Sequence, residues 1–490
     1  MSGYKYPLLI FLLFFSNSCE RQINHDQSSS VNILAKIGEK IITVNDFKKR
    51  SEYMPRPAYC KGDNYIHKKI AFNSLIAEKL LSLEFDDNNY IFTDTQKAFI
   101  LGQKEQTMRH LMLKKFGYDS VKIDSPEINS LVKLSKRKYN ISFCVVNKKH
   151  MNNIKKNLND ISINELKASI DDKIIIDNKT LSKDDDMLEE IKQTLYFEKP
   201  KLNKIYGPFN IDIENVLYFE INEWLTRPNI TKAQKKESFD LIQKEFIKQK
   251  ALQFFSNKVS KIMKGKSIEY NPKVFKQFSE KLSEIYLIEK SKKENVIQNK
   301  IWELKENEKP ISFESIKTLE NKIILTHDNK NYTVQKLLYL IKTHPLVFRN
   351  KKATSKSFPK ELKYAIADLF RDYHITQNAY SLNLHKNFEA INTESKWSDY
   401  IKSTIVKNNI SNYKNNLKTP TNHLINKIDS LQNKYSDIIK IDTDKFEKIK
   451  LSKIDMSVMY SNQAYTKPEP SFPILTSDHN LDYGEKHVFK

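Results

Sequence analysis

The chain has 490 residues, a length that fits about three domains better than one hydrophobic core. Its formal net charge is +22, and Gly occurs only 8 times. The basic residues are spread along the whole chain among Glu, Asp and Asn, with no zinc-finger spacing and no glycine-rich phosphate loop beside them. We therefore expect no nucleic-acid partner. Because helices tolerate a glycine-poor chain better than tightly turned sheets do, a mostly helical fold is expected.

The first residues predict export. The apolar run from Pro7 to Phe15 is too short to span a bilayer and is typical of the core of a secretory signal. Cys19 follows Ser-Asn-Ser and resembles the acylated cysteine of bacterial lipoproteins, so we expect it to carry a lipid. The alternative is plain signal cleavage, which leaves Cys19 as an ordinary thiol. The polar, Ser-rich residues 19–32 are expected to form a tether.

A hairpin that leads into a helix is predicted next. The β-prone stretches Ile33–Ile37 and Ile41–Ile42 flank Gly38, and Thr43 has Asp46 three residues later, the spacing of a helix-capping box. Two longer helices are predicted over 68–85 and 97–116. Their inward faces are expected to carry Phe72, Leu75, Ile76, Leu80 and Leu83 in the first and Leu101, Met108, Leu111 and Met112 in the second. Neither helix is apolar all round, so the helices are expected to pack on one another.

Strands replace helices in the middle of the chain. A strand is predicted over 139–147, a helix over 150–170, and a turn with a hairpin that ends at Trp224. A strand, a helix and a closing hairpin describe a small α+β domain. Cys144 lies in the first, apolar strand, and we expect a buried free thiol there in preference to a disulfide with Cys60.

The opening unit recurs near the other end of the chain. The stretch "IILTHDNKNYTVQKL" (Ile323–Leu337) repeats the hairpin and the helix start, with Thr333-Val334 at the positions of Thr43-Val44. We interpret this as a duplicated unit, because one copy cannot bury its own apolar face, and we expect the two copies to close one body around the middle domain. The alternative is that a hairpin followed by a helix is a common motif.

These residues resemble the exported foldases of the SurA/PrsA type. The stretches "AKIGEKIITVNDFKKR" and "IAFNSLIAEKLLSLEF" are similar to the hairpin and the helices that open those proteins, with matches at Gly38, Ile42, Thr43, Phe47, Leu75, Ile76, Glu78, Lys79 and Leu80. The resemblance implies a parvulin-type peptidyl-prolyl isomerase domain after this segment and then further helices. This is the order of modules read from the residues over 33–265.

The middle domain departs from the parvulin pattern where catalysis resides. Tyr206-Gly207-Pro208-Phe209 is similar to the family's Gly-Pro turn, but Ser142 and Leu217 stand at the positions of its two His residues, and no Gly lies between Gly117 and Gly207. Isomerisation needs an apolar pocket and polar groups that favour a twisted amide. We therefore expect a degenerate domain with no catalytic residue.

The resemblance also implies a pocket and a client-binding surface. The candidate pocket residues are Tyr206, Phe209 and Tyr218, and the candidate client-binding residues are Phe47, Tyr53 and Met54. The His residues show no HExxH or other tight spacing, so we expect no metal and no cofactor. Two pairs could still meet in space, namely His327 with His344 and His67 with Cys60, but we expect these His side chains to be solvated or hydrogen-bonded instead.

The sequence thus predicts an α+β, mostly α, protein in which helical chaperone modules flank a small parvulin-like domain. We expect a foldase or chaperone, exported to the periplasm or outer membrane and lipid-anchored in the membrane, whose partners are unfolded envelope or secreted proteins. The alternatives are an active peptidyl-prolyl isomerase and a structural lipoprotein of an envelope complex; the oligomeric state stays open. The predicted segments are a signal peptide (1–18), a tether (19–32), an N-terminal module (33–138), the parvulin-like domain (139–228), a helical segment (229–310), a second module (311–465) and a loose tail (466–490).

Overall fold

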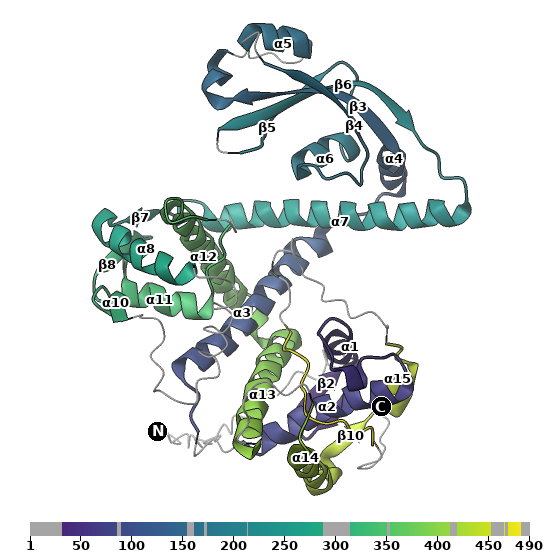
Figure 1. The fold of residues 1–490 in the computed structure, drawn as a ribbon, viewed down its shortest axis with the longest axis vertical. Helices are drawn as coiled ribbons and strands as arrows, with labels where there is room; N and C mark the ends of the chain where they lie inside the picture. Colours follow the sequence, from purple (N-terminus) through teal and green to yellow (C-terminus); the bar gives the residue numbers. More distant parts are fainter. Residues whose placement is uncertain are drawn as a thin grey trace, which may run out of the picture. The chain divides into compact units, whose positions relative to one another are not determined.

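The computed structural model is mostly helical with small antiparallel sheets, which is the predicted α+β class (Figure 1). It describes residues 32–85, 90–153, 161–170, 174–212, 214–287, 314–349, 353–411, 419–451, 465 and 469–481, so the predicted signal peptide and Cys19 lie outside the described residues. Two compact units divide the chain. Unit 1 comprises Met1–Arg109 and Lys266–Lys490, and unit 2 comprises His110–Gly265. None of the described helices combines the length and the apolar character needed to cross a bilayer.

Unit 1 contains two three-stranded sheets surrounded by helices. The first sheet has the order β10-β1-β2 and the second the order β7-β8-β9. The strands are β1 (Ile33–Ile37), β2 (Lys40–Thr43), β7 (Ile268–Tyr270), β8 (Ile323–His327), β9 (Lys330–Thr333) and β10 (Ile439–Ile441). The helices are α1 (Val44–Glu52), α2 (Tyr65–Leu83), α8 (Pro272–Tyr286), α10 (Glu314–Lys317), α11 (Val334–Thr343), α12 (Phe358–Ser381), α13 (Phe388–Ser411), α14 (Asn422–Lys434), α15 (Thr443–Lys448) and the first part of α3 (Asp94–Phe116).

The predicted repeat is present, and both copies belong to unit 1. The strands β1 and β2 pair through Ile33↔Thr43 and Ile37↔Lys40, and β8 and β9 pair through the residues 290 positions later, with the register irregularity at the same place. Each helix then begins after a Thr whose side chain accepts a hydrogen bond from the helical backbone, Thr43 in the first copy and Thr333 in the second. The two copies therefore share one backbone plan.

Each hairpin gains a third strand from a distant part of the chain. Strand β10 pairs with β1, and β7 pairs with β8, in equivalent registers. The residue after each third strand donates its N–H to the hairpin, Asp442 to Leu34 O (3.0 Å) and Asn271 to Ile324 O (2.9 Å), and its side chain caps the next helix. The sequence prediction of a purely helical segment over 229–310 missed β7. Three residues are too few to show an alternating pattern.

Helix α2 is buried on every side. Residues 70–82 are all buried, including Asn73, Ser74, Glu78 and Lys79. The prediction of one apolar face was therefore incomplete, because α13 and α14 also pack on α2 (Figure 1). The polar groups of α2 are satisfied inside the protein, as buried polar groups must be.

Buried ion pairs link α1 and α2 to distant segments. The Arg50 guanidinium donates to both Glu78 carboxylate oxygens at 2.7 Å. The exposed fractions of the two side chains are 1% and 0%. Lys79 Nζ lies 2.8 Å from Asp399 Oδ2 on α13. Lys396, also on α13, lies 2.8 Å from Asp46 Oδ1, the N-terminal acid of α1. Burying such charges is costly, and the pairing compensates for it only where every partner is in place.

The segment 469–481 packs in the core of unit 1. Phe472 and Leu475 are buried, and the carbonyl oxygen of Ser471 accepts a hydrogen bond from Arg50. Asn73 and Ser74 of α2 donate to two further carbonyls of the same segment. The prediction of a loose tail over 466–490 is thus wrong for 469–481, because an irregular backbone can be buried where side chains satisfy its carbonyls. Residues 482–490 lie outside the described part.

Unit 2 is built around a four-stranded antiparallel sheet of order β4-β3-β6-β5. Its strands are β3 (Arg137–Asn147), β4 (Ile176–Leu181), β5 (Ile205–Asn210) and β6 (Asn215–Thr226). Its helices are α4 (Ser125–Ser135), α5 (Ile163–Ile170), α6 (Glu189–Tyr196), α7 (Lys232–Met263) and the end of α3. Apolar side chains of α4 and α7, among them Leu131, Ile242 and Phe246, form a separate small core.

Replacing Glu78 by Ala should strongly destabilise unit 1. The Arg50 charge would stay buried without its carboxylate, so we expect the free energy of unfolding to fall by about 3–5 kcal/mol. Urea denaturation followed by circular dichroism measures the loss. Glu84→Ala is the matched control, because Glu84 pairs with the exposed Lys434, and it should cost less than about 1 kcal/mol. Equal losses of unfolding free energy in the two variants would show that Glu78 does not compensate for a buried Arg50 charge.

Acid should destabilise unit 1 through Asp46. Burial raises the pKa of Asp46, but the Lys396 charge and hydrogen bonds from Lys396, Thr43 and Asn392 outweigh burial and lower the pKa well below its ordinary value of 3.8. The unfolded chain therefore binds this proton more readily, and the stabilisation is present above pH 3.8 and lost as the pH falls below it. Between pH 5 and pH 3, the free energy of unfolding of Asp46→Asn should therefore fall by about 1 kcal/mol less than that of the wild type. Urea denaturation of both proteins at the two pH values measures this difference. An equal fall in the wild type and in Asp46→Asn would refute the prediction.

Candidate functional site

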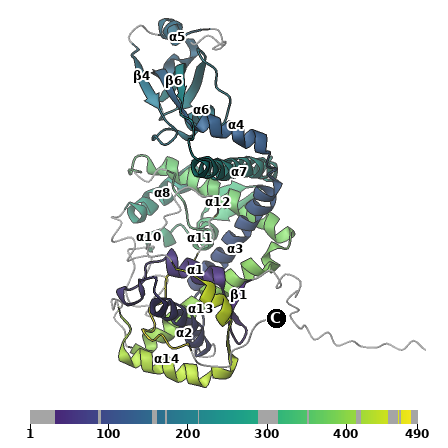
Figure 2. The ribbon, with the colours of Figure 1, turned by 90° about the vertical axis from the view of Figure 1, so that its right-hand side faces the viewer.

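Both faces of the sheet of unit 2 pack against a helix. One face packs against α6 through Tyr139, Ile141, Phe219 and Ile221, and the other packs against α5 through Cys144, Val146, Val216 and Tyr218. Figures 1 and 2 show the two helices on opposite sides of the sheet. The alternation of side chains along β3 and β6 produces this division. Cys144 is buried and free, as predicted, and burial raises the pKa of its thiol to about 11.

The α6 face carries a group of partly exposed aromatic side chains. The Phe219 ring is completely buried and is stacked with the rings of Tyr206 (5.3 Å between centroids) and Phe209 (5.5 Å). Helix α6 covers the other end of this face, where Tyr139 Oη donates to Leu195 O at 2.8 Å. We call Phe143, Val145, Tyr206, Phe209, Leu217 and Phe219 the aromatic surface.

Solvent reaches part of the aromatic surface. Val145 is 44% exposed and faces Leu217 across the β3–β6 pair. Phe143, Tyr206, Phe209 and Leu217 are only half-buried. An apolar side chain that docks there would remove further apolar surface from water, which is favourable by about 25 cal/mol per Å².

The structure brings together two of the three predicted pocket residues. Tyr206 and Phe209 lie on the aromatic surface, but Tyr218 is 1% exposed and packs on the α5 face, where burial raises the pKa of its hydroxyl. Placing Tyr218 in the same pocket was therefore wrong, because neighbouring residues of a strand point to opposite faces. Its neighbour Phe219 lies on the same face as Tyr206 and Phe209.

The two positions assigned to the family's His residues also lie on opposite faces. Leu217 belongs to the aromatic surface, whereas Ser142 shares a face with Cys144 and contacts Asn178 and Asn222 through its hydroxyl (2.7 and 2.8 Å). Side chains at these two positions cannot touch. The partner of Ser142 in the strand pairing is Glu220, whose carboxylate accepts the Ile163 N–H at the start of α5.

The expected Gly-Pro turn lies within strand β5. Gly207 has a φ of +136°, and the pairing of β5 with β6 shifts register between Tyr206 and Phe209. A Cβ atom at Gly207 would lie 2.7 Å from Leu217 O and 2.7 Å from the Tyr218 ring. Only glycine therefore fits this bend, which places the rings of Tyr206 and Phe209 on either side of it against Phe219.

The candidate client-binding residues are located in unit 1. Phe47 is completely buried and packs edge-on against Phe72 in the core, so a client cannot contact it in this structure. Tyr53 and Met54 follow α1 and are partly exposed. Only these two of the three residues are accessible.

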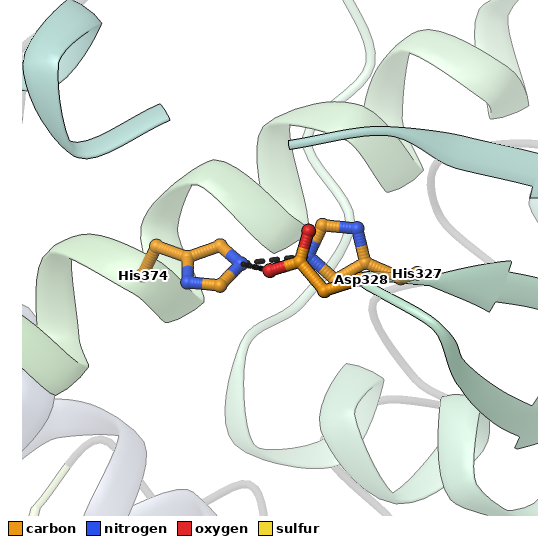
Figure 3. Close-up of side chains that lie close together, drawn as sticks. All are labelled: His327, Asp328 and His374. Carbon is orange, nitrogen blue, oxygen red and sulfur yellow. Dashed lines mark hydrogen bonds and ion pairs between the residues drawn. The ribbon is translucent and has the colours of Figure 1, made fainter. Parts of the chain in front are cut away.

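The structure pairs His327 with a different His from the one considered in the sequence. His327 at the end of β8 lies 2.6 Å from His374 on α12, measured between the two Nε2 atoms, and Asp328 lies beside both (Figure 3). Burial and the Lys266 charge lower the pKa of His374 to about 4, so it is neutral at neutral pH. His344 pairs instead with Glu105 (2.7 Å), and His67 accepts the Gly62 N–H. Among the described residues, this group of three is the one that could hold a metal ion.

Gly207→Ala should loosen the sheet of unit 2. Gly265→Ala is the matched control, because Gly265 also has a positive φ of +77° but nothing within 4 Å of the added Cβ. In the control, backbone strain alone should lower the free energy of unfolding by about 1–2 kcal/mol. In Gly207→Ala the close contacts add to this strain, and we expect a loss of roughly 3 kcal/mol or more. Hydrogen exchange of peptides from β5 and β6 measures the effect. Equal protection of those peptides in the two variants would refute the close approach at Gly207.

No protein-family model, no curated protein and no solved structure matches this chain. The functional proposals therefore rest on its own residues and their geometry.

Proposed function

We propose that the protein is a foldase-like chaperone that holds unfolded chains, and that its small sheet domain is a degenerate parvulin domain. The observation that carries this proposal is the aromatic surface, on which the rings of Tyr206 and Phe209 stack on the buried Phe219 and lie partly open to solvent. A proline ring or an aromatic side chain of an extended client can pack on such rings, because aromatic faces bind apolar groups with little loss of conformational entropy.

The order of elements in unit 2 supports the parvulin assignment. The domain opens with strand β3 and closes with the hairpin of β5 and β6, which contains Gly207-Pro208. The closing strand β6 pairs with the opening strand β3 along its whole length. This order of an opening strand, a helix and a closing hairpin supports the resemblance to the parvulin domain.

The chemistry of the aromatic surface favours binding over catalysis. Its members are apolar apart from the Tyr206 hydroxyl, which accepts the Lys201 N–H at 2.7 Å. Isomerisation requires polar groups that stabilise a twisted amide, and one hydroxyl does not supply them. Half-buried rings also leave little area to gain, so affinity stays low and a client can leave.

Export and the lipid anchor complete the proposal. The apolar run before Cys19 supports passage across a membrane, and acylation of Cys19 would hold the protein at the membrane surface. A second signal, such as a second acyl chain or a basic patch, is needed for a stable anchor. The net charge of +22 favours acidic clients.

The purified protein should suppress the aggregation of a chemically unfolded protein at equimolar ratio, measured by light scattering. Phe209→Ala removes one ring of the stack and should reduce suppression by about half or more, because the loss of a buried aromatic contact costs roughly 1 kcal/mol or more. Ile230→Ala is the control, since Ile230 is 85% exposed in the same unit but lies outside the aromatic surface, and it should suppress like the wild type.

Three outcomes would contradict the proposal. A wild type that does not suppress aggregation indicates a structural lipoprotein. Equal suppression by wild type and Phe209→Ala, with both variants folded by circular dichroism, places the client elsewhere. The third outcome is isomerase activity. A rate of proline isomerisation above background in a protease-coupled peptide assay would indicate an active isomerase.

A further inference from the structure

The group formed by His327, Asp328 and His374 has the geometry of a metal-ligand set. Its ligand atoms all lie within 4.8 Å of one another. Asp328 Oδ2 is 4.0 Å from His327 Nε2 and 3.7 Å from His374 Nε2. Figure 3 shows the two rings and the carboxylate converging on one point from the β8–β9 turn and from α12.

The hydrogen bonds around His327 orient the Nε2 lone pair toward this point, where it accepts a hydrogen bond from His374 Nε2. Its Nδ1 lies 2.7 Å from the carbonyl oxygen of Ser267, which can only accept, so Nδ1 carries the proton. In the neutral ring Nε2 is then unprotonated and faces His374. A backbone carbonyl that holds the far nitrogen of a His is the usual outer partner of a metal-binding imidazole.

The first copy of the repeat shows that the hairpin does not need these residues. The positions equivalent to His327 and Asp328 are Ile37 and Gly38, and both hairpins have the same register. Ile37 is completely buried, as an ordinary core residue. Asp328 has a positive φ of 49°, which Asp adopts readily, so the turn accounts for the carboxylate, but the fold does not account for an imidazole at position 327.

One cation already lies at the group. Lys266 Nζ is 2.5 Å from Asp328 Oδ2, and the pair is partly exposed. Since a positive charge beside the carboxylate competes with a metal ion, Lys266 must swing aside when the ion binds. The Lys side chain is flexible and solvent-accessible, so this movement meets little resistance.

We propose that His327 Nε2, His374 Nε2 and Asp328 Oδ2 bind one divalent first-row transition ion, with Zn²⁺ the preferred species. Two imidazoles and one carboxylate are typical zinc ligands, and water takes the fourth position. His374 Nε2 donates the hydrogen bond between the rings, so binding requires its proton to move to His374 Nδ1. It also requires the two Nε2 atoms to separate from 2.6 Å to about 3.3 Å, the spacing set by tetrahedral bonds of about 2.05 Å. His374, whose side chain is 14% exposed, has room for this shift.

The bound ion would fasten the second hairpin to α12. His327 and Asp328 belong to the β8–β9 hairpin and His374 to α12, and the two elements already share an apolar core that includes Leu325 and Phe370. The ion would replace the hydrogen bond between the two imidazoles by three ligand bonds and so add to these contacts. This site is independent of the aromatic surface, so its test does not depend on the chaperone proposal.

Calorimetric titration of the chelator-treated full chain with ZnCl₂ tests the site, with bound zinc counted by elemental analysis after dialysis. We expect one tight equivalent per chain and a higher melting temperature. His374→Gln and Asp328→Asn should weaken binding by about 100-fold or more, because each removes one of three ligands. His423→Gln, which removes an exposed His of α14, should bind like the wild type.

A further variant separates loss of binding from loss of folding. Lys266→Met removes the competing cation and should tighten Zn²⁺ binding by about tenfold, an increase that a misfolded chain cannot give. Unchanged affinity in His374→Gln, with the variant folded by circular dichroism, would overturn the proposal. Equal weakening in His423→Gln would do the same, since it would show that zinc binds to scattered surface imidazoles.

Discussion

The ion pair between Arg50 and Glu78 is the constraint on which unit 1 depends. Both side chains are buried, so their charges are stable only while no water enters and no partner is lost. Segments far along the chain provide that enclosure. The carbonyl of Ser471 accepts from Arg50, and Asp399 of α13 holds Lys79, the neighbour of Glu78. The hairpin and α2 therefore cannot form their native core without residues more than 300 positions later.

A different constraint governs unit 2. Its sheet has two apolar faces, and only short helices are present to cover them. Helix α6 has eight residues and spans only part of its face, where its last residue, Tyr196, packs edge-on against Tyr139 of the sheet. Beyond its end the face can be closed only by its own rings, and Phe219 is buried because Tyr206 and Phe209 stack on it. The same geometry that completes the core leaves apolar rings half-open to solvent. The aromatic surface thus arises from the way in which this core is completed.

Local patterns in the sequence predicted the local structure well. The Thr43 cap, both copies of the hairpin and the buried free thiol of Cys144 follow from short-range chemistry. Contacts between distant segments left no such pattern. The three-residue strand β7 has no readable period, and His374 lies 47 residues from His327 in an amphipathic helix, where a lone His gives no signal. The error at Tyr218 was one of parity: a shift of one residue in a strand exchanges the two faces of a sheet.

The two copies of the repeat join hairpin to helix by different chemistry. In the first, Ile37 is an apolar core residue, and apolar contacts need no partner atoms. In the second, His327 occupies the same place and packs on Phe370 with ring centroids 4.3 Å apart. Burying an imidazole is unfavourable, and the two hydrogen bonds of His327 only compensate for this cost. His327 therefore stabilises the fold no more than isoleucine would. An imidazole at this place is therefore better explained by what it can bind than by what it packs against.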